Sequence, residues 1–300
     1  MPSQGPRPTL SLPSGAARPG DFSVGGTAAP GSELRLVVDG DLAAASAMRA
    51  GADGRWQAIV DTSRMVDPAV RHRVTAWSAE QGAAVPRSFR VVREWRLAAD
   101  VADPALDDHG PDGKYSRPSD PSYGQQMDLR RVRAWTAGGA LRLELTMGEI
   151  TRGWNPLFGF DHVAFTIFIE LPGRGDGATV MPLQHASLPE GMRWHLRLRA
   201  HGFANALFEA DGASATHEGR PVAAAADIRT DTVKRSVTFT LPAAVFGSTT
   251  ALTGARLYVT TWDYDGGYRA LKPDVGPYVF GGGPAEGPKV LDASTVVTLD

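Results

Sequence analysis

The chain has 300 residues, of which 42% are hydrophobic and 21% charged, values typical of a folded globular protein. Its 31 basic and 33 acidic residues give a net charge of −2, which offers no bulk electrostatic attraction for nucleic acid or a membrane surface. The 34 glycines and 22 prolines predict many turns, and the absence of cysteine excludes disulfides, thiolate metal sites and a cysteine nucleophile.

The first twenty residues are rich in proline, glycine and serine, so we expect a flexible arm over residues 1–20. They contain no basic start followed by an apolar stretch, the pattern of a secretory signal. No apolar run in the sequence approaches the ~18 residues that cross a bilayer, so no membrane span is expected.

Short alternating segments follow the arm, with glycine or an Asp-Gly pair between them. Residues 34–38, 56–60, 70–76 and 89–93 alternate apolar and polar side chains, as half-buried strands do. Strands at this spacing predict a small β-sandwich over residues 21–94. The alanine-rich stretch 42–50 is a candidate for one or two helical turns, although it lacks a convincing cap.

The segment 99–123 is different because it repeats Asp, Pro and Gly and holds few apolar residues. It is long for a connection inside a compact domain, and such loops usually carry function or lack order. We place a domain boundary just before it, near residues 94–96. The longer strands and the short helical turn expected after it lie at residues 141–147, 162–171, 193–200, 233–241, 242–247, 256–262 and 294–299. They predict a large antiparallel sandwich over residues 97–300, which makes the fold class all-β throughout.

The strongest local signal is a cluster of acidic residues, Asp103, Asp107, Asp108 and Asp112, within ten positions. Carboxylates this close repel one another unless a cation offsets them, and calcium takes six to eight oxygen ligands in flexible loops. The spacing is not that of an EF-hand. From the residues alone, a calcium site and a solvated group of Asp-Pro-Gly turns are equally compatible. A pair of glycosidase carboxylates is poorly supported, because a catalytic acid needs an apolar setting.

Aromatic residues in or beside predicted loops are candidates for sugar contacts, because sugars present C–H faces that stack on aromatic rings. The candidates are Trp154, Trp262, Tyr264 and Tyr268, with Tyr278 nearby. The competing interpretation of residues 261–269 is a tight Asp-Gly turn flanked by ordinary strand aromatics. The tryptophans that lie in predicted strands are expected in the cores: Trp56, Trp77, Trp135 and Trp194.

Other motifs give no catalytic residue. His195 and Arg197 alternate with apolar residues on one strand, and we expect a solvated sheet face or a surface covered by a loop there, in preference to an anion or sugar groove. The sequence has no HExxH zinc motif, no GxSxG serine elbow and no phosphate-binding Walker loop. A haem-binding sandwich would need axial His or Met ligands, which the sequence alone does not pair.

Several motifs in the same order resemble the glucodextranase C-terminal domain family. They are the runs 103–111 with Tyr115 and Pro118, then 127–129, 154–156, 263–269 and 280–282. The resemblance covers roughly residues 97–300. It implies a large β-sandwich of the kind shared by DOMON domains, of jelly-roll type, and by a carbohydrate-binding module family.

The resemblance further implies an accessory, non-catalytic module that binds structural calcium and polysaccharide. Carried onto this sequence, it favours Asp103, Asp107 and Asp108 as calcium ligands. Asp128 and Asp292 are further candidates, although both can also cap turns. The glucan-degrading enzymes carry a catalytic domain before this module, and the present sequence shows none.

Residues 21–94 resemble bacterial immunoglobulin-like repeats, through the run 26–32 before a strand, the Asp-Gly-x-Trp of residues 53–56, and the run 72–76. The two resemblances together predict an extracellular or cell-surface protein that binds α-glucan or a cell-envelope glycan. A separate glycoside hydrolase is its expected partner, and nucleic acid is not. Three alternatives stay open: a glycoside hydrolase acting alone, a haem or redox sandwich, and a purely structural surface protein.

Overall fold

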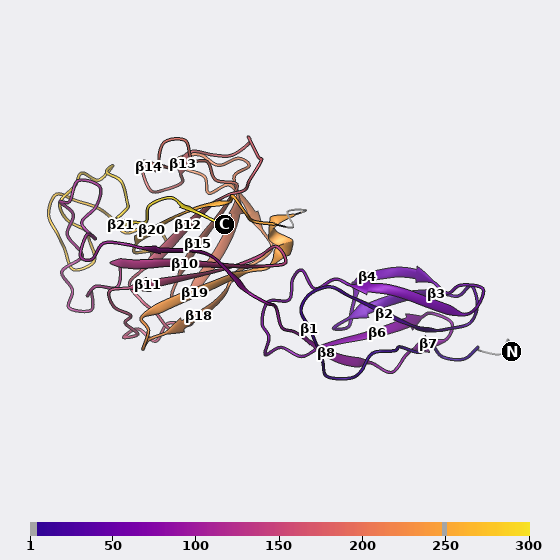
Figure 1. The fold of residues 1–300 in the computed structure, drawn as a ribbon. Coiled ribbons are helices and arrows are strands. Elements are labelled where there is room, and N and C mark those ends of the chain that lie inside the picture. Colours follow the sequence, from indigo (N-terminus) through magenta and orange to yellow (C-terminus); the bar gives the residue numbers. More distant parts are fainter. Residues whose placement is uncertain (1–4, 248–250) are drawn as a thin grey trace. The chain divides into compact units, whose positions relative to one another are not determined.

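The computed structural model describes residues 5–247 and 251–300, and it consists of β-strands with one short 3₁₀ turn (Figure 1). The chain divides into two compact units, Met1–Glu94 and Trp95–Asp300, each with its own buried core. The all-β fold class predicted from the sequence is confirmed. No helix in the described part of the chain is long and apolar enough to cross a membrane.

The first unit packs a six-stranded sheet against a pair of strands. The sheet has the order β1-β8-β6-β3-β4, with β7 paired to β6, and the pair is β2-β5. Alternating side chains from both layers, among them Val24, Leu34, Trp56 and Val74, meet in one apolar core. The strands are β1 (Ala16–Arg18), β2 (Phe22–Thr27), β3 (Glu33–Val38), β4 (Asp41–Arg49), β5 (Arg55–Val60), β6 (His72–Ser78), β7 (Gly82–Ala83) and β8 (Arg87–Val91).

Two parts of this unit differ from the sequence-based expectation. The alanine-rich stretch is strand β4 and not a helix, because Asp39 and Gly40 form a two-residue turn with φ of 52° and 79° that returns the chain along β3. The expected flexible arm is wrong for most of its length. Leu10 and Leu12 are buried in the core, and β1 pairs in parallel with β8.

The second unit is a larger sandwich of two sheets. One sheet has the order β18-β19-β11-β10-β9, and the other β17-β16-β15-β12-β20-β21, with β22 also paired to β20. Phe165 of β12 meets Phe239 of β19 with ring centroids 5.4 Å apart, which joins the two layers through the core. The elements are β9 (Arg96–Ala102), β10 (Leu129–Ala137), β11 (Ala140–Met147), β12 (Ala164–Glu170), β13 (Val180–Met181), β14 (Ala186–Ser187), β15 (Leu196–His201), β16 (Ala204–Glu209), β17 (Arg220–Val222), β18 (Asp227–Asp231), β19 (Ser236–Leu241), η1 (Ala243–Phe246), β20 (Arg256–Trp262), β21 (Asp292–Ala293) and β22 (Val297–Thr298).

Of the two expectations for the face around His195 and Arg197, the solvated face is wrong, because both side chains are fully buried, as the alternative of a covered surface requires. Arg197 forms an ion pair with Glu218, which neutralises its buried charge. The tryptophan expectations hold for Trp56 and Trp194, which are buried. Trp77 and Trp135 are instead only partly buried, because they alternate out of phase with the inward residues of their strands.

Two irregular stretches pack against each other in the second unit. We call residues 103–128 the acidic loop and residues 263–291 the C-terminal segment. Gly110 N–H donates to the Leu291 carbonyl at 2.8 Å, Ser119 N–H donates to the Gly276 carbonyl at 2.9 Å, and Ser116 forms an isolated bridge with Gly281. Figure 1 shows the two stretches side by side beyond the ends of the strands. Backbone pairs far apart in the sequence therefore fix the acidic loop against the sandwich.

Gly282 permits the close approach between these two stretches. Its φ is 89°, and a Cβ atom there would lie 2.1 Å from the Lys114 carbonyl oxygen. Only glycine meets both conditions without strain.

We therefore expect Gly282→Ala to destabilise the second unit by at least about 1–3 kcal/mol, the range for one strained backbone position. Chemical unfolding followed by tryptophan fluorescence measures the change. Gly175→Ala is the matched control, because a Cβ at Gly175 meets nothing within 4 Å. Equal stabilities of the two variants would contradict the close contact.

Candidate functional site

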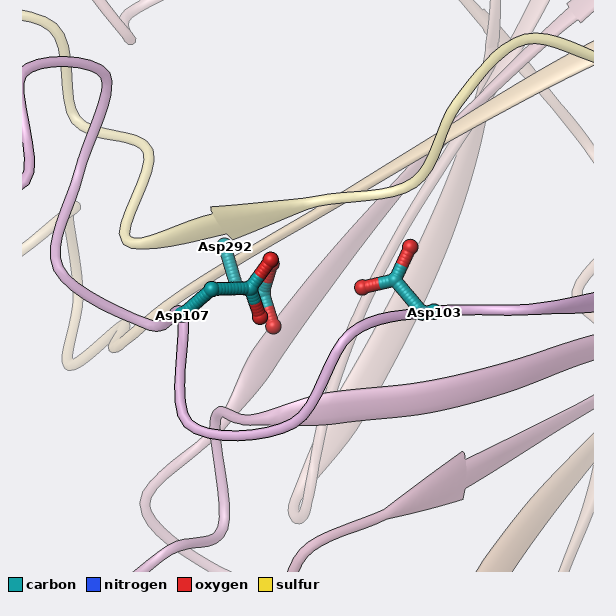
Figure 2. A group of neighbouring side chains, drawn as sticks. All are labelled: Asp103, Asp107 and Asp292. Carbon is teal, nitrogen blue, oxygen red and sulfur yellow. The ribbon is translucent and has the colours of Figure 1, made fainter.

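Three carboxylates from distant parts of the chain meet where the acidic loop begins. Asp103 directly follows β9, a left-handed residue at Leu106 (φ 63°) turns the chain back to Asp107, and β21 supplies Asp292. One oxygen of each carboxylate lies within 4.8 Å of the others. Figure 2 shows Asp103 facing the carboxylates of Asp107 and Asp292. We call these three residues the acidic cluster.

The two remaining metal candidates lie beside this cluster with contacts of their own. Asp128 is fully buried, accepts a hydrogen bond from Leu106 N–H and forms an ion pair with Arg130 at 2.5 Å. Asp108 is 1% exposed, and its Oδ2 has no hydrogen-bond partner among the described residues, although Arg117 lies 3.7 Å away. The fold thus brings together three of the five predicted ligands.

The electrostatics of the acidic cluster favour a bound cation. Burial, together with the nearby charges of Asp107 and Asp128, raises the pKa of Asp103 to about 7. Burial also raises the pKa of Asp292 to about 8, despite its hydrogen bonds from two backbone N–H groups. Asp103 Oδ2 is buried and has no hydrogen-bond partner among the residues that the structure describes. Asp107 is exposed and both oxygens of Asp292 accept backbone hydrogen bonds, so Asp103 Oδ2 is the buried, unpaired oxygen of the cluster. Carboxylate oxygens gathered this closely fit the needs of a hard divalent ion such as calcium.

A second candidate site is a pocket of about 200 Å³ with aromatic walls. It holds the volume of about seven water molecules at ~30 Å³ each. Loop 151–161, the end of β15 and the start of the C-terminal segment all contribute to it. Its lining includes Trp154, His162, His201, Phe203, Tyr264 and Arg269, with Asp161, Asp263 and Asp265 as the acidic members. The rings of Trp154 and Phe203 are about half exposed at its edge.

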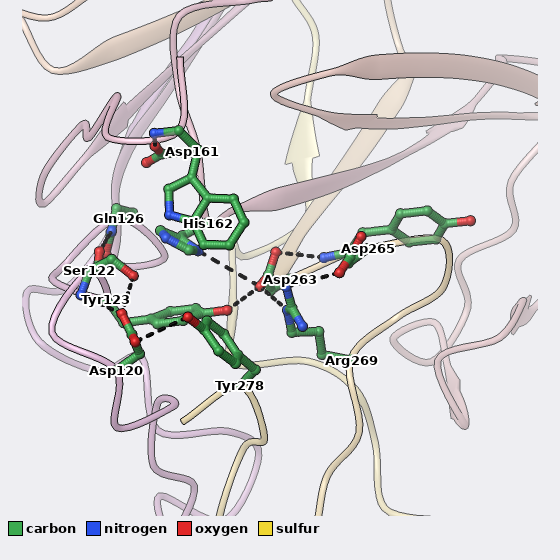
Figure 3. Close-up of polar contacts among 12 residues, drawn as sticks. Asp120, Ser122, Tyr123, Gln126, Asp161, His162, Asp263, Asp265, Arg269 and Tyr278 are labelled. Carbon is green, nitrogen blue, oxygen red and sulfur yellow. Dashed lines mark hydrogen bonds and ion pairs between the residues drawn. The ribbon is translucent and has the colours of Figure 1, made fainter. Parts of the chain in front are cut away.

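Asp263 organises this pocket (Figure 3). Its Oδ2 accepts hydrogen bonds from the Tyr123 hydroxyl of the acidic loop and from Arg269 Nε, and its Oδ1 accepts one from Tyr264 N–H. Burial tends to raise the pKa of Asp263, but the neighbouring His162, the hydrogen bond from Tyr123 and the charge of Arg269 hold it below its ordinary value. Asp263 therefore stays ionised.

His162 lies on the inner wall of the pocket in an unusual setting. Its φ of 57° lies in the left-handed region, which is uncommon for residues other than glycine. Its ring packs on Tyr123 at 4.1 Å and meets Trp154 edge to face at 5.4 Å. The side chain is 5% exposed, and Nε2 has no hydrogen-bond partner within the described ranges.

The structure separates the four predicted sugar-contacting aromatics into two groups. Trp154 and Tyr264 line the pocket together. Trp262 and Tyr268 are wrong as ligand contacts, because the Trp262 ring is fully buried against Phe280 and Tyr268 is 8% exposed. Both face inward because the strand and turn that carry them alternate toward the core. Sequence reasoning missed His162 and Arg269, although Arg269 ends the Asp-Gly-Gly-Tyr run that it singled out.

The same geometry bears on catalysis. Glycoside hydrolysis needs a carboxylic acid whose pKa is raised so that it can protonate the leaving oxygen. The pKa of Asp263 is shifted the opposite way. Asp263 thus suits the fixing of neighbouring donors more than the transfer of a proton.

Residues 98–298 match the family model described as the C-terminal binding module, SLH-like, of glucodextranase. This match spans most of the chain, so the chain belongs to this family, and the resemblance seen in the sequence is confirmed. No curated protein matches the chain.

Solved structures resemble the chain only distantly. The human OSCAR ligand-binding domain is 13% identical, with 99% of this chain and 100% of that chain covered and a TM-score of 0.23. A 1.5-MDa bacterial ice-binding adhesin is 10% identical, with 88% and 61% covered and a TM-score of 0.20. A Ca²⁺-stabilised adhesin of an Antarctic bacterium is 14% identical, with 87% and 45% covered and a TM-score of 0.17. Scores this low support no statement about this chain.

The acidic cluster predicts a pH dependence of stability in the presence of a chelator. Because the pKa values of Asp103 and Asp292 are raised on folding, the unfolded chain releases these protons first as the pH rises. The stability of the second unit should therefore fall between about pH 4 and pH 8.

Asp107→Asn tests this explanation, because it removes one repelling charge without changing the size of the side chain. With chelator at pH 8, we expect this variant to melt a few degrees higher than the unaltered protein, or about 1 kcal/mol. Asp112→Asn is the control, from the same loop but outside the cluster. A lower melting temperature for Asp107→Asn under these conditions would show that the three carboxylates do not repel.

Proposed function

We propose, on the premise that the chain belongs to the family of glucodextranase C-terminal binding modules, that its second unit is a non-catalytic accessory module that binds carbohydrate. The ligand is an α-glucan or a polysaccharide of the cell envelope. The protein then works outside the cell or at its surface, beside a separate glycoside hydrolase that acts on the same polymer.

The observation that carries this proposal is the Trp154 pocket. The ring of Trp154 is 51% exposed at the edge of a hollow whose walls also hold Tyr264 and the carboxylates of Asp263 and Asp265. An exposed ring can stack on the C–H face of a sugar, and the surrounding carboxylates and imidazoles can bind its hydroxyl groups. The volume of about 200 Å³ suits one sugar unit of a longer chain that continues over the open edge.

We further propose that calcium binds at the acidic cluster and has a structural role. Asp103, Asp107 and Asp292 would supply the carboxylate oxygens. Calcium would supply the positive charge that allows these groups to ionise together.

The acidic loop connects the two proposed sites. Asp103 and Asp107 lie near its start, while Tyr123, near its end, donates a hydrogen bond to Asp263 in the pocket. A cation that orders the start of this loop would restrict the positions open to Tyr123, and so would help to preorganise the pocket for its ligand.

Calcium should raise the melting temperature of the protein. An ion that binds only the folded state at 100 times its Kd stabilises it by about 2.7 kcal/mol. We expect the melting temperature at pH 8 to increase by several degrees with calcium and by less with magnesium. In the Asp107→Asn variant, calcium should change the melting temperature little. Equal melting temperatures with calcium and with chelator would exclude the metal site.

Binding to insoluble or gel-embedded polysaccharide tests the pocket. We expect Trp154→Ala to weaken retention at least tenfold, which corresponds to a loss of about 1.4 kcal/mol. Trp135→Ala is the control, because this ring is also partly exposed but lies on β10 outside the pocket. Failure of the unaltered protein to bind any α-glucan or envelope polysaccharide would leave a purely structural role.

A further inference from the structure

The first unit has a hollow of its own on the outer face of its six-stranded sheet. The volume of this hollow is about 780 Å³, within the range of small-molecule sites. Strands β3, β4 and β6 supply most of its lining, which includes Glu33, Arg35, Leu42, Arg49 and Trp77. We call it the Trp77 hollow. It lies outside residues 98–298, which match the glucodextranase module, so the function proposed above does not account for it.

An irregularity in β4 shapes one wall of the Trp77 hollow. In the ladder between β3 and β4, residues 42–45 lie opposite Val37 alone, which makes this part of β4 a bulge. Asp41 Oδ1 fixes the bulge, because it accepts hydrogen bonds from two of its backbone N–H groups. Leu42 is left 52% exposed and lines the hollow with an apolar side chain. The wall is therefore held in place by the protein itself.

The charge of the lining is positive. Arg35 is exposed, and its side chain forms no hydrogen bond, ion pair or ring contact with any residue that the structure describes. Arg49 pairs with Glu33, but these side chains are 67% and 83% exposed, and such exposed pairs contribute little to stability. One guanidinium in the hollow is therefore free, and a second is only weakly held.

Neighbouring strands add positive charge to the same face. Arg35 lies directly opposite Trp77 in the ladder between β3 and β6. Alternation along β6 and β8 turns Arg73 and Arg90 to this face as well, because Arg73 lies opposite Ser88. An anion that approaches the hollow is therefore attracted by the surrounding surface.

Trp77 supplies a surface for a flat ligand. Its side chain is only partly buried, because it faces away from the core, and its indole N–H has no hydrogen-bond partner among the described residues. An aromatic face stacks on the C–H groups of a sugar ring, and a guanidinium binds two oxygens of a carboxylate or phosphate at once. A sugar ring with an anionic substituent can engage Trp77 and Arg35 together.

From this combination we infer that the first unit binds an acidic sugar, one that carries a carboxylate or a phosphate, in the Trp77 hollow. The ring would stack on Trp77 beside Leu42, and the anionic group would accept hydrogen bonds from Arg35. This inference goes beyond the proposed function, which concerns the second unit, and it gives the chain a second site for a different class of sugar.

Three sugars that differ only at carbon 6 test the inference: glucuronate, glucose 6-phosphate and glucose. Each is titrated into the full chain at pH 7, and binding is followed by the indole signal of Trp77 in an NMR spectrum. The absence of this signal from Trp77→Phe identifies it. We expect the acidic sugars to bind at least about tenfold more tightly than glucose, because a charged acceptor strengthens the hydrogen bonds from Arg35. Inorganic phosphate, which has no ring, should bind more weakly than glucose 6-phosphate.

Two pairs of variants separate the hollow from bulk charge. Arg35→Gln should remove the preference for acidic sugars, whereas Arg55→Gln changes the net charge equally on β5, outside the lining, and should keep it. Leu42→Glu places a competing carboxylate in the hollow and should abolish binding of the acidic sugars. Val85→Glu adds the same charge at another exposed position of the first unit and should not.

Several results would overturn the inference. They are the absence of binding by both acidic sugars, equal binding of all three sugars, or equal losses in Arg35→Gln and Arg55→Gln. If inorganic phosphate binds as tightly as glucose 6-phosphate, the hollow recognises an anion alone and the sugar assignment fails. Binding of only one acidic sugar would support the inference and identify the anionic group. Trp154→Ala should leave these affinities unchanged, so the outcome is independent of the function proposed for the second unit.

Discussion

Carboxylates hold the acidic loop where no β-ladder is available. Residues 103–128 contain no strand beyond one isolated bridge, so little regular backbone pairing ties them to the sandwich. Asp128 accepts a backbone hydrogen bond from Leu106 near the start of the loop, and Asp292 accepts one from Leu129, directly after the loop. Near its end, Asp263 accepts a hydrogen bond from the Tyr123 hydroxyl. Buried charges bind such donors strongly, but each charge must be fully compensated for the loop to be stable. The rest of the site depends on how this compensation is achieved.

The two ends of the loop achieve it differently. Asp263 is compensated within the protein, because Arg269, Tyr123 and Tyr264 N–H surround its carboxylate and its pKa lies below the ordinary value. Asp103 and Asp292 lack a comparable cation of their own, and their pKa values are strongly raised by burial. The charge of Asp263 is therefore compensated by the protein itself, whereas Asp103 and Asp292 favour either bound protons or a bound cation. A ligand-binding loop anchored in this way can respond to its ionic surroundings at one end while the pocket geometry is kept at the other.

Much of the fold was predictable from local patterns, whereas the site was predictable only in part. Alternation placed β11 and β15, and the run of apolar residues placed β12, because side chains on a strand point to opposite faces. The same rule does not tell which face a further layer of chain covers, which is why the sequence left open whether the face of Arg197 is solvated or covered. The acidic residues of the loop were visible as a group, but Asp292 reaches them only through the pairing of β21 with β20, a contact between distant residues. His162 has no sequence signal, since its role comes from a left-handed backbone and from rings that tertiary packing supplies.

The chemical character of the pocket suits recognition more than turnover. A catalytic acid must gain and lose a proton near the working pH, which requires a pKa close to that pH. Asp263 is instead fixed in its charged form by three donors, and the pocket keeps one polarity, rich in acceptors and poor in free donors. Fixed polarity is what distinguishes one ligand from another, because a ligand with the wrong hydrogen-bonding groups leaves buried atoms unpaired. The same hydrogen bonds that hold the acidic loop in place therefore also fix the polarity that the pocket presents to a ligand.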